Sequence, residues 1–102
     1  MKTGQEPIYE LVRTIPAGRV LGYKAVGQLS SVFFGARQVG QVMAAAWDDD
    51  LPWWRVTASD GSMATARRDP RLAAEQRRLL ESEGVGFNGD RVARAFFWDG
   101  EQ

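Results

Sequence analysis

The hydrophobic pattern of the chain predicts a first helix close to its start. Pro7 suits the first turn of such a helix, because the N–H that proline lacks is not needed there. Pro16-Ala17-Gly18 then ends the helix. Between these points, apolar side chains recur at intervals of three and four residues, which places them on one helical face: Ile8, Leu11, Val12 and Ile15.

Two shorter helices are predicted to follow and to form a helix-turn-helix. The first spans about 23–29, and Gly35 opens the second. A turn over residues 30–35 joins them, which is the arrangement typical of this motif. The second of these helices is expected to bury a stripe of apolar side chains: Val39, Val42, Met43 and Ala46.

The opposite face of that helix is smooth. Ala36, Gly40 and Ala44 recur every four residues, flanked by Arg37 and Gln41. A glycine inside a helix costs about 1 kcal/mol relative to alanine, so some other interaction is expected to offset it. Two interpretations stay open, which are close packing against a neighbouring element and close approach to a nucleic-acid groove too narrow for a bulkier helix.

The stretch after Pro52 predicts a β-hairpin that would form a small wing. Residues 53–58 have strand character, and Ser59-Asp60-Gly61 has the composition of a tight turn. Residues 62–66 would then return as the second strand.

The last third of the chain predicts a longer helix and a closing strand. Pro70 opens the helix, and Gly84 ends it as a C-terminal cap. Its apolar positions are Leu72, Leu79 and Leu80. Residues 92–98 are expected to form a short strand that returns Phe96 or Phe97, together with Trp98, to the core.

Length and charge limit the classes of protein that fit. The chain has 102 residues, of which 44% are hydrophobic, and we interpret residues 1–102 as one domain and as a monomer. Basic and acidic side chains balance at 13 each, so a surface that binds nucleic acid would have to be a local patch. The apolar runs are too short for a membrane span, and the start lacks the apolar segment of a signal peptide, so we expect a cytoplasmic protein.

Two missing residue types exclude much chemistry. The sequence contains no Cys and no His. Disulfides, thiol nucleophiles, thiolate metal sites and imidazole bases are therefore excluded. We expect no catalytic residue, no metal and no cofactor.

Four motifs stand out along the chain: Tyr23, Gly35-Ala36-Arg37-Gln38-Val39-Gly40, Pro52-Trp53-Trp54-Arg55-Val56 and Leu79-Leu80-Glu81-Ser82-Glu83-Gly84. In their order and near their spacing, they resemble the DNA-binding domain of O6-alkylguanine-DNA alkyltransferases. The resemblance covers roughly residues 7–98 and is closest to the alkyltransferase-like proteins, which carry Trp in place of the acceptor Cys. It implies an α/β fold, a winged helix-turn-helix of the alkyltransferase C-terminal type with a small hairpin wing.

The same resemblance implies that the repair reaction is lost. The transferases carry Pro-Cys-His-Arg-Val, in which a His supported by a Glu activates the Cys. Here Trp53 stands at the Cys position and Trp54 at the His position, and Glu83 matches the Glu, left with no imidazole to orient. An indole N–H is only a donor and is no nucleophile. Trp54 is expected either to donate one hydrogen bond or to pack in the core.

By resemblance, the DNA-binding residues are retained. Tyr23 crowds the backbone beside the target base, and Arg37 enters the stack in its place, where a planar guanidinium can stack and donate hydrogen bonds. The smooth helix face lies in the minor groove. The implied DNA-binding set is Tyr23, Ala36, Arg37, Gln38, Gly40 and Gln41.

The implied lesion pocket follows the Trp pair. Pro52, Trp53, Trp54, Arg55 and Val56 form its mouth, and residues from Ser62 to Thr65 form the far wall. Trp53 offers an aromatic surface where the alkyl group would lie, and stacking of this kind is worth about 1–3 kcal/mol per base.

Several positions depart from the family. Gly22 stands where Ser or Thr usually caps the next helix, and Ala44 is near a position that often carries Arg. Asp48-Asp49-Asp50 would repel phosphates unless these side chains face away. Compensating positive charge could come from Lys24, Arg67, Arg68 and Arg71.

The leading hypothesis is a non-enzymatic sensor that flips and binds O6-alkylguanine in double-stranded DNA without removing the alkyl group. The resemblance further implies hand-over to nucleotide excision repair proteins. One rival is a winged-helix regulator that reads a specific sequence through Arg37, Gln38 and Gln41. A second is an enzyme that uses Asp60 or Glu83 as acid or base.

Overall fold

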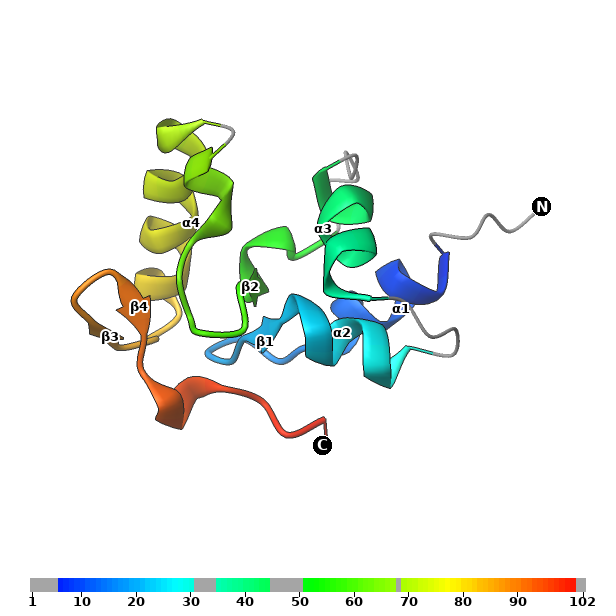
Figure 1. Ribbon diagram of the computed structural model, residues 1–102. Coiled ribbons are helices and arrows are strands. Elements are labelled where there is room, and N and C mark those ends of the chain that lie inside the picture. The colour runs from blue at the N-terminus through cyan, green and yellow to red at the C-terminus, as the bar shows by residue number, and fades with distance from the viewer. Residues whose placement is uncertain (1–5, 31–34, 45–50, 68, 101–102) are drawn as a thin grey trace.

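The structure is a computed structural model that describes residues 6–30, 35–44, 51–67 and 69–100 (Figure 1). The expectations for Asp48–Asp50, Ala46, Arg68 and most of the 30–35 turn lie outside the described residues, and so does the side chain of Arg67. Four α-helices are present: α1 (Glu6–Thr14), α2 (Tyr23–Leu29), α3 (Ala36–Ala44) and α4 (Pro70–Ser82). Four two-residue strands complete the framework: β1 (Leu21–Gly22), β2 (Val56–Thr57), β3 (Phe87–Asn88) and β4 (Arg91–Val92).

The elements form two groups with the first strand pair between them. Helices α1, α2 and α3 lie together on one side, and α4 with the β3–β4 hairpin lies on the other (Figure 1). Strand β1 pairs in parallel with β2 in the middle, with Leu21 opposite Val56 and Gly22 opposite Thr57. Strand β1, which precedes α2, and strand β2, which leads toward α4, therefore both lie between the two groups.

The core has two clusters that follow this division. The first gathers apolar side chains of α1, β1, α2, α3 and β2, among them Ile8, Val12, Val26, Val39 and Val56. The second is smaller and joins Val20, Leu80, Val85 and Val92. The helical periodicities of the sequence are thereby confirmed, because Ile8, Val12, Ile15, Val39 and Met43 are buried.

The ends of α4 are set by local sequence signals. The side chain of Asp69 caps the N-terminus by accepting a hydrogen bond from the Arg71 N–H at 2.9 Å, and Pro70 opens the first turn. At the C-terminus the Val85 N–H donates to the Leu80 carbonyl at 3.1 Å, and Gly84 has a φ of 89°. This is a Schellman closure, and its usual hydrophobic contact is made by Leu80 and Val85, which share the second cluster.

The hairpin predicted over residues 53–66 is wrong. Residues 53–55 form one turn of 3₁₀ helix, and β2 follows for only two residues. The tight turn is present, since the Ala58 N–H donates to the Ser62 carbonyl at 3.0 Å. After this turn the chain does not run back along β2. Instead, a second 3₁₀ turn, Ala64–Arg67, leads into α4, and the Thr65 hydroxyl of that turn donates to Gln76 of α4.

A hairpin occurs instead near the C-terminus, where β3 pairs with β4 in antiparallel fashion. The closing strand predicted over residues 92–98 is therefore shorter than expected, and a 3₁₀ turn, Arg94–Phe96, follows it. Phe97 then forms an isolated parallel bridge with Val20. The predicted return of aromatic side chains is confirmed, since Phe96 and Phe97 pack on the second cluster and Trp98 packs on the first.

Within the described part of the chain, no helix has the length and apolar character needed to cross a membrane.

Gly22 has a packing role that the sequence did not reveal. It precedes α2 as its N-cap residue and makes no side-chain capping bond. A Cβ built at this position would lie 2.8 Å from the Ser59 Cα and 3.3 Å from the Ser59 backbone N. Both are backbone atoms, so a side chain would force β1 away from the turn that follows β2.

We therefore expect Gly22→Ser to lower the free energy of unfolding by about 1–3 kcal/mol, the usual range for overpacking, although serine is normally a slightly better helix cap than glycine. Urea unfolding of the two proteins measures the difference. Gly40→Ala is the control, because no described atom outside its own helix backbone lies within 4 Å of a Cβ there and helix propensity alone should stabilise it by about 1 kcal/mol. A Gly22→Ser protein as stable as the wild type would contradict the close approach.

Candidate nucleic-acid interface

The outer face of α3 is open to solvent. Ala36, Arg37 and Gln41 are exposed, and Gly40 and Ala44 are half-buried. No described atom lies within 4 Å of a Cβ built on Gly40. Close packing against another described element therefore does not explain why residue 40 is glycine. The second interpretation, close approach to a binding partner, stays open.

Gln38 has a local role on the same helix. Its side-chain oxygen accepts a hydrogen bond from the Gly35 N–H at 2.9 Å, which caps one of the unpaired amides at the start of α3. The Gln38 side chain, which was predicted to contact DNA, thus uses its oxygen to cap its own helix. Arg37 and Gln41 are the exposed polar side chains of α3 for which the structure records no such bond.

The chain segment that contains the two helices of the motif has basic side chains and no acidic one. Between Leu11 and Trp47 the sequence has no Asp or Glu, while it has Arg13, Arg19, Lys24 and Arg37. Lys24 and Arg37 are exposed, and no ion pair of the described residues involves either. A chain with no net charge can present a local positive patch in this way.

The arginines of α4 differ, because carboxylates neutralise them. Arg71 pairs with Asp69 at 3.2 Å, Arg77 pairs with Glu81 at 3.3 Å, and Arg78 pairs with Glu75 at 2.5 Å. The proposed contribution of Arg71 to a DNA-binding patch would therefore compete with its own ion pair.

Tyr23 joins this surface to the middle of the molecule. It is the first residue of α2 and follows β1 directly, so the pairing of β1 with β2 fixes where the helix begins. Its ring is half-buried and packs against the first core cluster.

The Trp pair lies on the 3₁₀ turn just before β2. The two indoles meet edge to face, with ring centroids 6.0 Å apart and planes at 86°. Trp53 packs against the first core cluster and Trp54 against the second, so the two neighbouring side chains face the two halves of the molecule. Both are half-buried.

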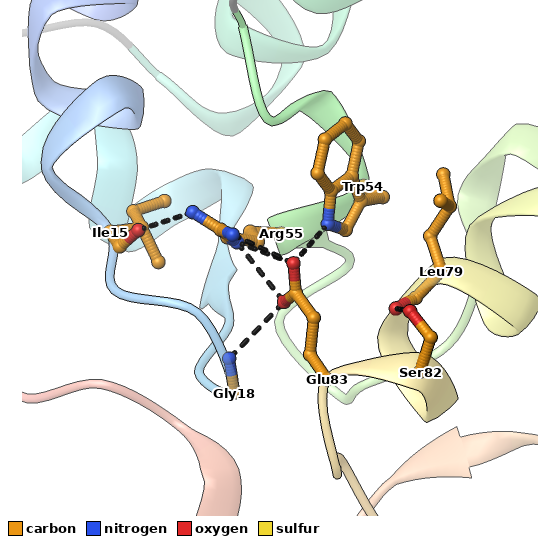
Figure 2. A network of polar contacts seen from close by, with 7 residues as sticks. All are labelled: Ile15, Gly18, Trp54, Arg55, Leu79, Ser82 and Glu83. Atoms are coloured by element: carbon orange, nitrogen blue, oxygen red, sulfur yellow. Dashed lines mark hydrogen bonds and ion pairs between the residues drawn. The ribbon is translucent and has the colours of Figure 1, made fainter.

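The carboxylate of Glu83 is the centre of a polar network beneath this turn (Figure 2). Glu83 follows the last residue of α4 and accepts hydrogen bonds from three donors: the Trp54 Nε1–H at 2.9 Å, the Gly18 N–H at 3.1 Å and the Arg55 guanidinium, whose closest contact is 2.7 Å. Gly18 has a φ of 86°, a conformation that favours glycine and aims its N–H at the carboxylate.

The network explains the charge state of Glu83. Burial on its own raises the pKa of the carboxyl, but hydrogen bonds from Arg55, Trp54 and Gly18 outweigh it, and the net pKa lies below the ordinary value for Glu. Glu83 has no imidazole to orient, as the sequence indicates, but it does not lack an aromatic donor. The indole of Trp54 takes that place as donor, and the same residue also packs in the core.

Arg55 is turned inward rather than toward a pocket mouth. Only 16% of its side chain is exposed, and its Nη1 donates to the Ile15 carbonyl at 2.9 Å while the rest of the guanidinium binds Glu83. It also lies over the Trp54 ring, 5.5 Å from the centroid. The predicted role of Arg55 as a lesion contact therefore gives way to a structural one.

Of the other predicted pocket residues, Pro52, Val56 and Thr65 are buried and support the segment from within. Ser62 lies in the turn after β2, where its N–H and hydroxyl both donate to Asp60. The half-buried apolar side chains of this set are Trp53, Trp54, Met63 and Ala64, and the two indoles are the largest of them.

One site residue was missed from the sequence. Gln76 is only 1% exposed, and its side-chain amide donates to the carbonyls of Trp54 at 3.1 Å and Val56 at 2.9 Å. Its oxygen accepts from the Thr65 hydroxyl at 2.8 Å, so every part of the buried amide is engaged. The available signal was a glutamine one helical turn before Leu79 and Leu80, on the buried side of α4.

Residues 3–85 match the family described as 6-O-methylguanine DNA methyltransferase, DNA binding domain. This match spans most of the chain, and the protein belongs to that family.

Named relatives agree with this assignment. The "Alkyltransferase-like protein 1" of Schizosaccharomyces pombe is 38% identical over 81 residues, which are 76% of this chain and 72% of that protein. The "DNA base-flipping protein" of Vibrio parahaemolyticus is 29% identical over 94 residues, 89% of this chain and 91% of that protein.

A solved structure confirms the predicted α/β fold of the alkyltransferase type. The crystal structure of S. pombe Atl1 in complex with damaged DNA containing O6-carboxymethylguanine matches with a TM-score of 0.80 at 27% identity. The match covers 97% of this chain and 99% of the Atl1 chain.

The lowered pKa of Glu83 makes its contribution to stability depend on pH. The carboxylate stabilises the fold above the pKa of an unfolded Glu, about 4.3, and this stabilisation is lost as the pH falls through the lower pKa of the folded state. We expect Glu83→Gln to lower the free energy of unfolding by about 2–3 kcal/mol at pH 7, because Arg55 loses its counter-charge.

Urea unfolding at pH 7 and at pH 3 measures this effect, and the difference between the two proteins should shrink at the lower pH. Glu81→Gln, in an exposed ion pair on the same helix, is the matched control and should change little at either pH. A Glu83→Gln difference that is the same at both values would contradict the network.

Proposed function

We propose that the protein binds double-stranded DNA containing O6-alkylguanine, turns the modified base out of the stack and holds it without removing the alkyl group. The observation that carries the proposal is the outer face of α3, which is smooth, positively charged and uncovered by any described residue. The relatives named "DNA base-flipping protein" and "Alkyltransferase-like protein 1", and the Atl1 complex with damaged DNA, support it.

Each part of the surface has a task in this proposal. The face formed by Ala36, Gly40 and Ala44 approaches the minor groove, which is about 6 Å wide and excludes bulky side chains. Arg37 enters the stack in place of the extruded base. Tyr23, held at the start of α2 by β1, crowds the backbone beside it. Flipping costs a few kcal/mol, which stacking of the base against Trp53 offsets in part.

Alkyl transfer is not part of the proposed function. The sequence has no Cys, and the indoles at positions 53 and 54 can donate but cannot attack carbon. Glu83 already accepts hydrogen bonds from Trp54, Arg55 and Gly18. The protein therefore acts as a lesion receptor, and hand-over of the bound lesion to nucleotide excision repair stays a prediction.

The two rival functions find less support. For an enzyme, Glu83 is ionised and enclosed by its donors, while the hydroxyl and N–H of Ser62 lower the pKa of the exposed Asp60. With pKa values below the ordinary range, neither carboxyl is suited to act as a general acid near neutral pH. For a sequence-reading regulator, α3 offers Arg37 and Gln41, since Gln38 caps its own helix.

The absence of transfer can be tested by mass. After incubation with a duplex containing O6-methylguanine, we expect the intact protein to gain no methyl group. Trp53→Cys alone should transfer little or nothing, because no base activates the thiol. Trp53→Cys with Trp54→His should transfer measurably, since Glu83 already binds a ring N–H at position 54. A methyl adduct on the wild-type protein would contradict the proposal.

Base flipping can be tested at Arg37. We expect Arg37→Ala to weaken binding to the lesion duplex by about 1–3 kcal/mol, because a stacked and hydrogen-bonded guanidinium is lost. A fluorescent base analogue opposite the lesion reports unstacking, and its emission should rise with the wild-type protein and rise less with the variant. Tyr23→Phe should cost less than Tyr23→Ala, because the ring does the crowding.

Lys24→Ala is the matched control for Arg37→Ala, because it removes an exposed cation of the neighbouring helix. It should weaken lesion and undamaged duplexes by a similar factor, as a phosphate contact does. If Arg37→Ala behaves in the same way and the reporter never changes, the protein binds the groove without flipping, and the regulator is the better function.

A further inference from the structure

Trp54 is fixed from several directions. Its indole N–H donates to Glu83 Oε2 at 2.9 Å, and its carbonyl accepts from the Gln76 side chain at 3.1 Å. The Arg55 guanidinium lies over its ring at 5.5 Å. The only polar atom of the indole is thus hydrogen-bonded within the protein. The rest of the Trp54 ring is an apolar surface with a fixed orientation.

Trp53 is held in a different way. It packs on the first core cluster and meets Trp54 edge to face, at 6.0 Å between centroids and 86° between planes. Among the described residues, none accepts a hydrogen bond from its indole N–H. Packing alone therefore sets the orientation of Trp53, and the edge of Trp54 is one of the surfaces that set it.

We propose that Trp54 is a positioning residue for lesion recognition, whose hydrogen bond to Glu83 holds the ring against which Trp53 is oriented. This inference rests on the proposed function, in which Trp53 stacks on the flipped base. It assigns to Trp54 a share in discrimination between modified and unmodified guanine, exerted through Trp53 and without contact with the base.

The hydrogen bond matters more than the ring volume in this proposal. Glu83 is anchored at the end of α4 by the Schellman closure. Its carboxylate is held by two donors besides Trp54, since Gly18 donates to Oε1 and Arg55 donates to both oxygens (Figure 2). An N–H at position 54 therefore has a fixed acceptor. A ring without an N–H would fill most of the same space but could rotate, and Trp53 would rotate with it.

Two substitutions separate the bond from the volume. Trp54→Phe keeps a large apolar ring and removes the donor, while Trp54→His is smaller and restores an N–H. The readout is the ratio of affinities for two duplexes that differ only in O6-methylguanine or guanine at one position. We expect the ratio to fall about tenfold in Trp54→Phe, the equivalent of one hydrogen bond to a charged group, and to recover in part in Trp54→His.

Asp69→Ala is the control for a loss of stability alone. It removes the N-cap of α4 at the end opposite Glu83 and lowers the melting temperature through the same helix. Its affinity ratio should equal that of the wild type when all proteins are measured well below their melting temperatures.

The outcomes are distinct. A ratio that is unchanged in Trp54→Phe, that is lower in Trp54→His than in Trp54→Phe, or that falls equally in Asp69→Ala overturns the positioning role and leaves the proposed function intact. A wild-type ratio of one overturns the proposed function and this inference together.

Discussion

The arrangement of the candidate site depends on the carboxylate of Glu83, which lies at the C-terminus of α4. The C-terminus of a helix carries partial negative charge, so an acidic residue there is unfavourable by itself. Glu83 is stable in this place because three donors from two other segments converge on it: the Gly18 N–H, the Trp54 indole and the Arg55 guanidinium. The end of α4, the turn after α1 and the segment before β2 are therefore held at one point.

This point of contact links the two halves of the molecule. On one side, β1 pairs with β2 and fixes the start of α2, where Tyr23 lies. On the other, Gln76 of α4 holds the carbonyls of Trp54 and Val56. The surface proposed to approach DNA and the aromatic surface proposed to receive the base are thus fixed relative to each other by buried polar contacts, which are costly to break.

Much of this could be predicted from the sequence, wherever the signal is local. Apolar periodicity placed α1 and α3, and Pro70 and Gly84 bounded α4. The prediction of a hairpin over residues 53–66 failed because the path of this segment depends on a contact with a later helix, the Thr65–Gln76 hydrogen bond. For the same reason Gln76 went unnoticed, and so did the donors around Glu83. Gly22 looked like a weakened helix cap, and only the approach of Ser59 shows why a side chain would not fit.

The central claim is that this surface selects damaged DNA. The most direct measurement is the affinity of the wild-type protein for two otherwise identical duplexes with guanine or O6-methylguanine at one position, at one salt concentration. We expect tighter binding to the O6-methylguanine duplex by about 5-fold to 150-fold, since a contact of about 1–3 kcal/mol is made only with the flipped, modified base. Equal affinity for the two duplexes would contradict the account.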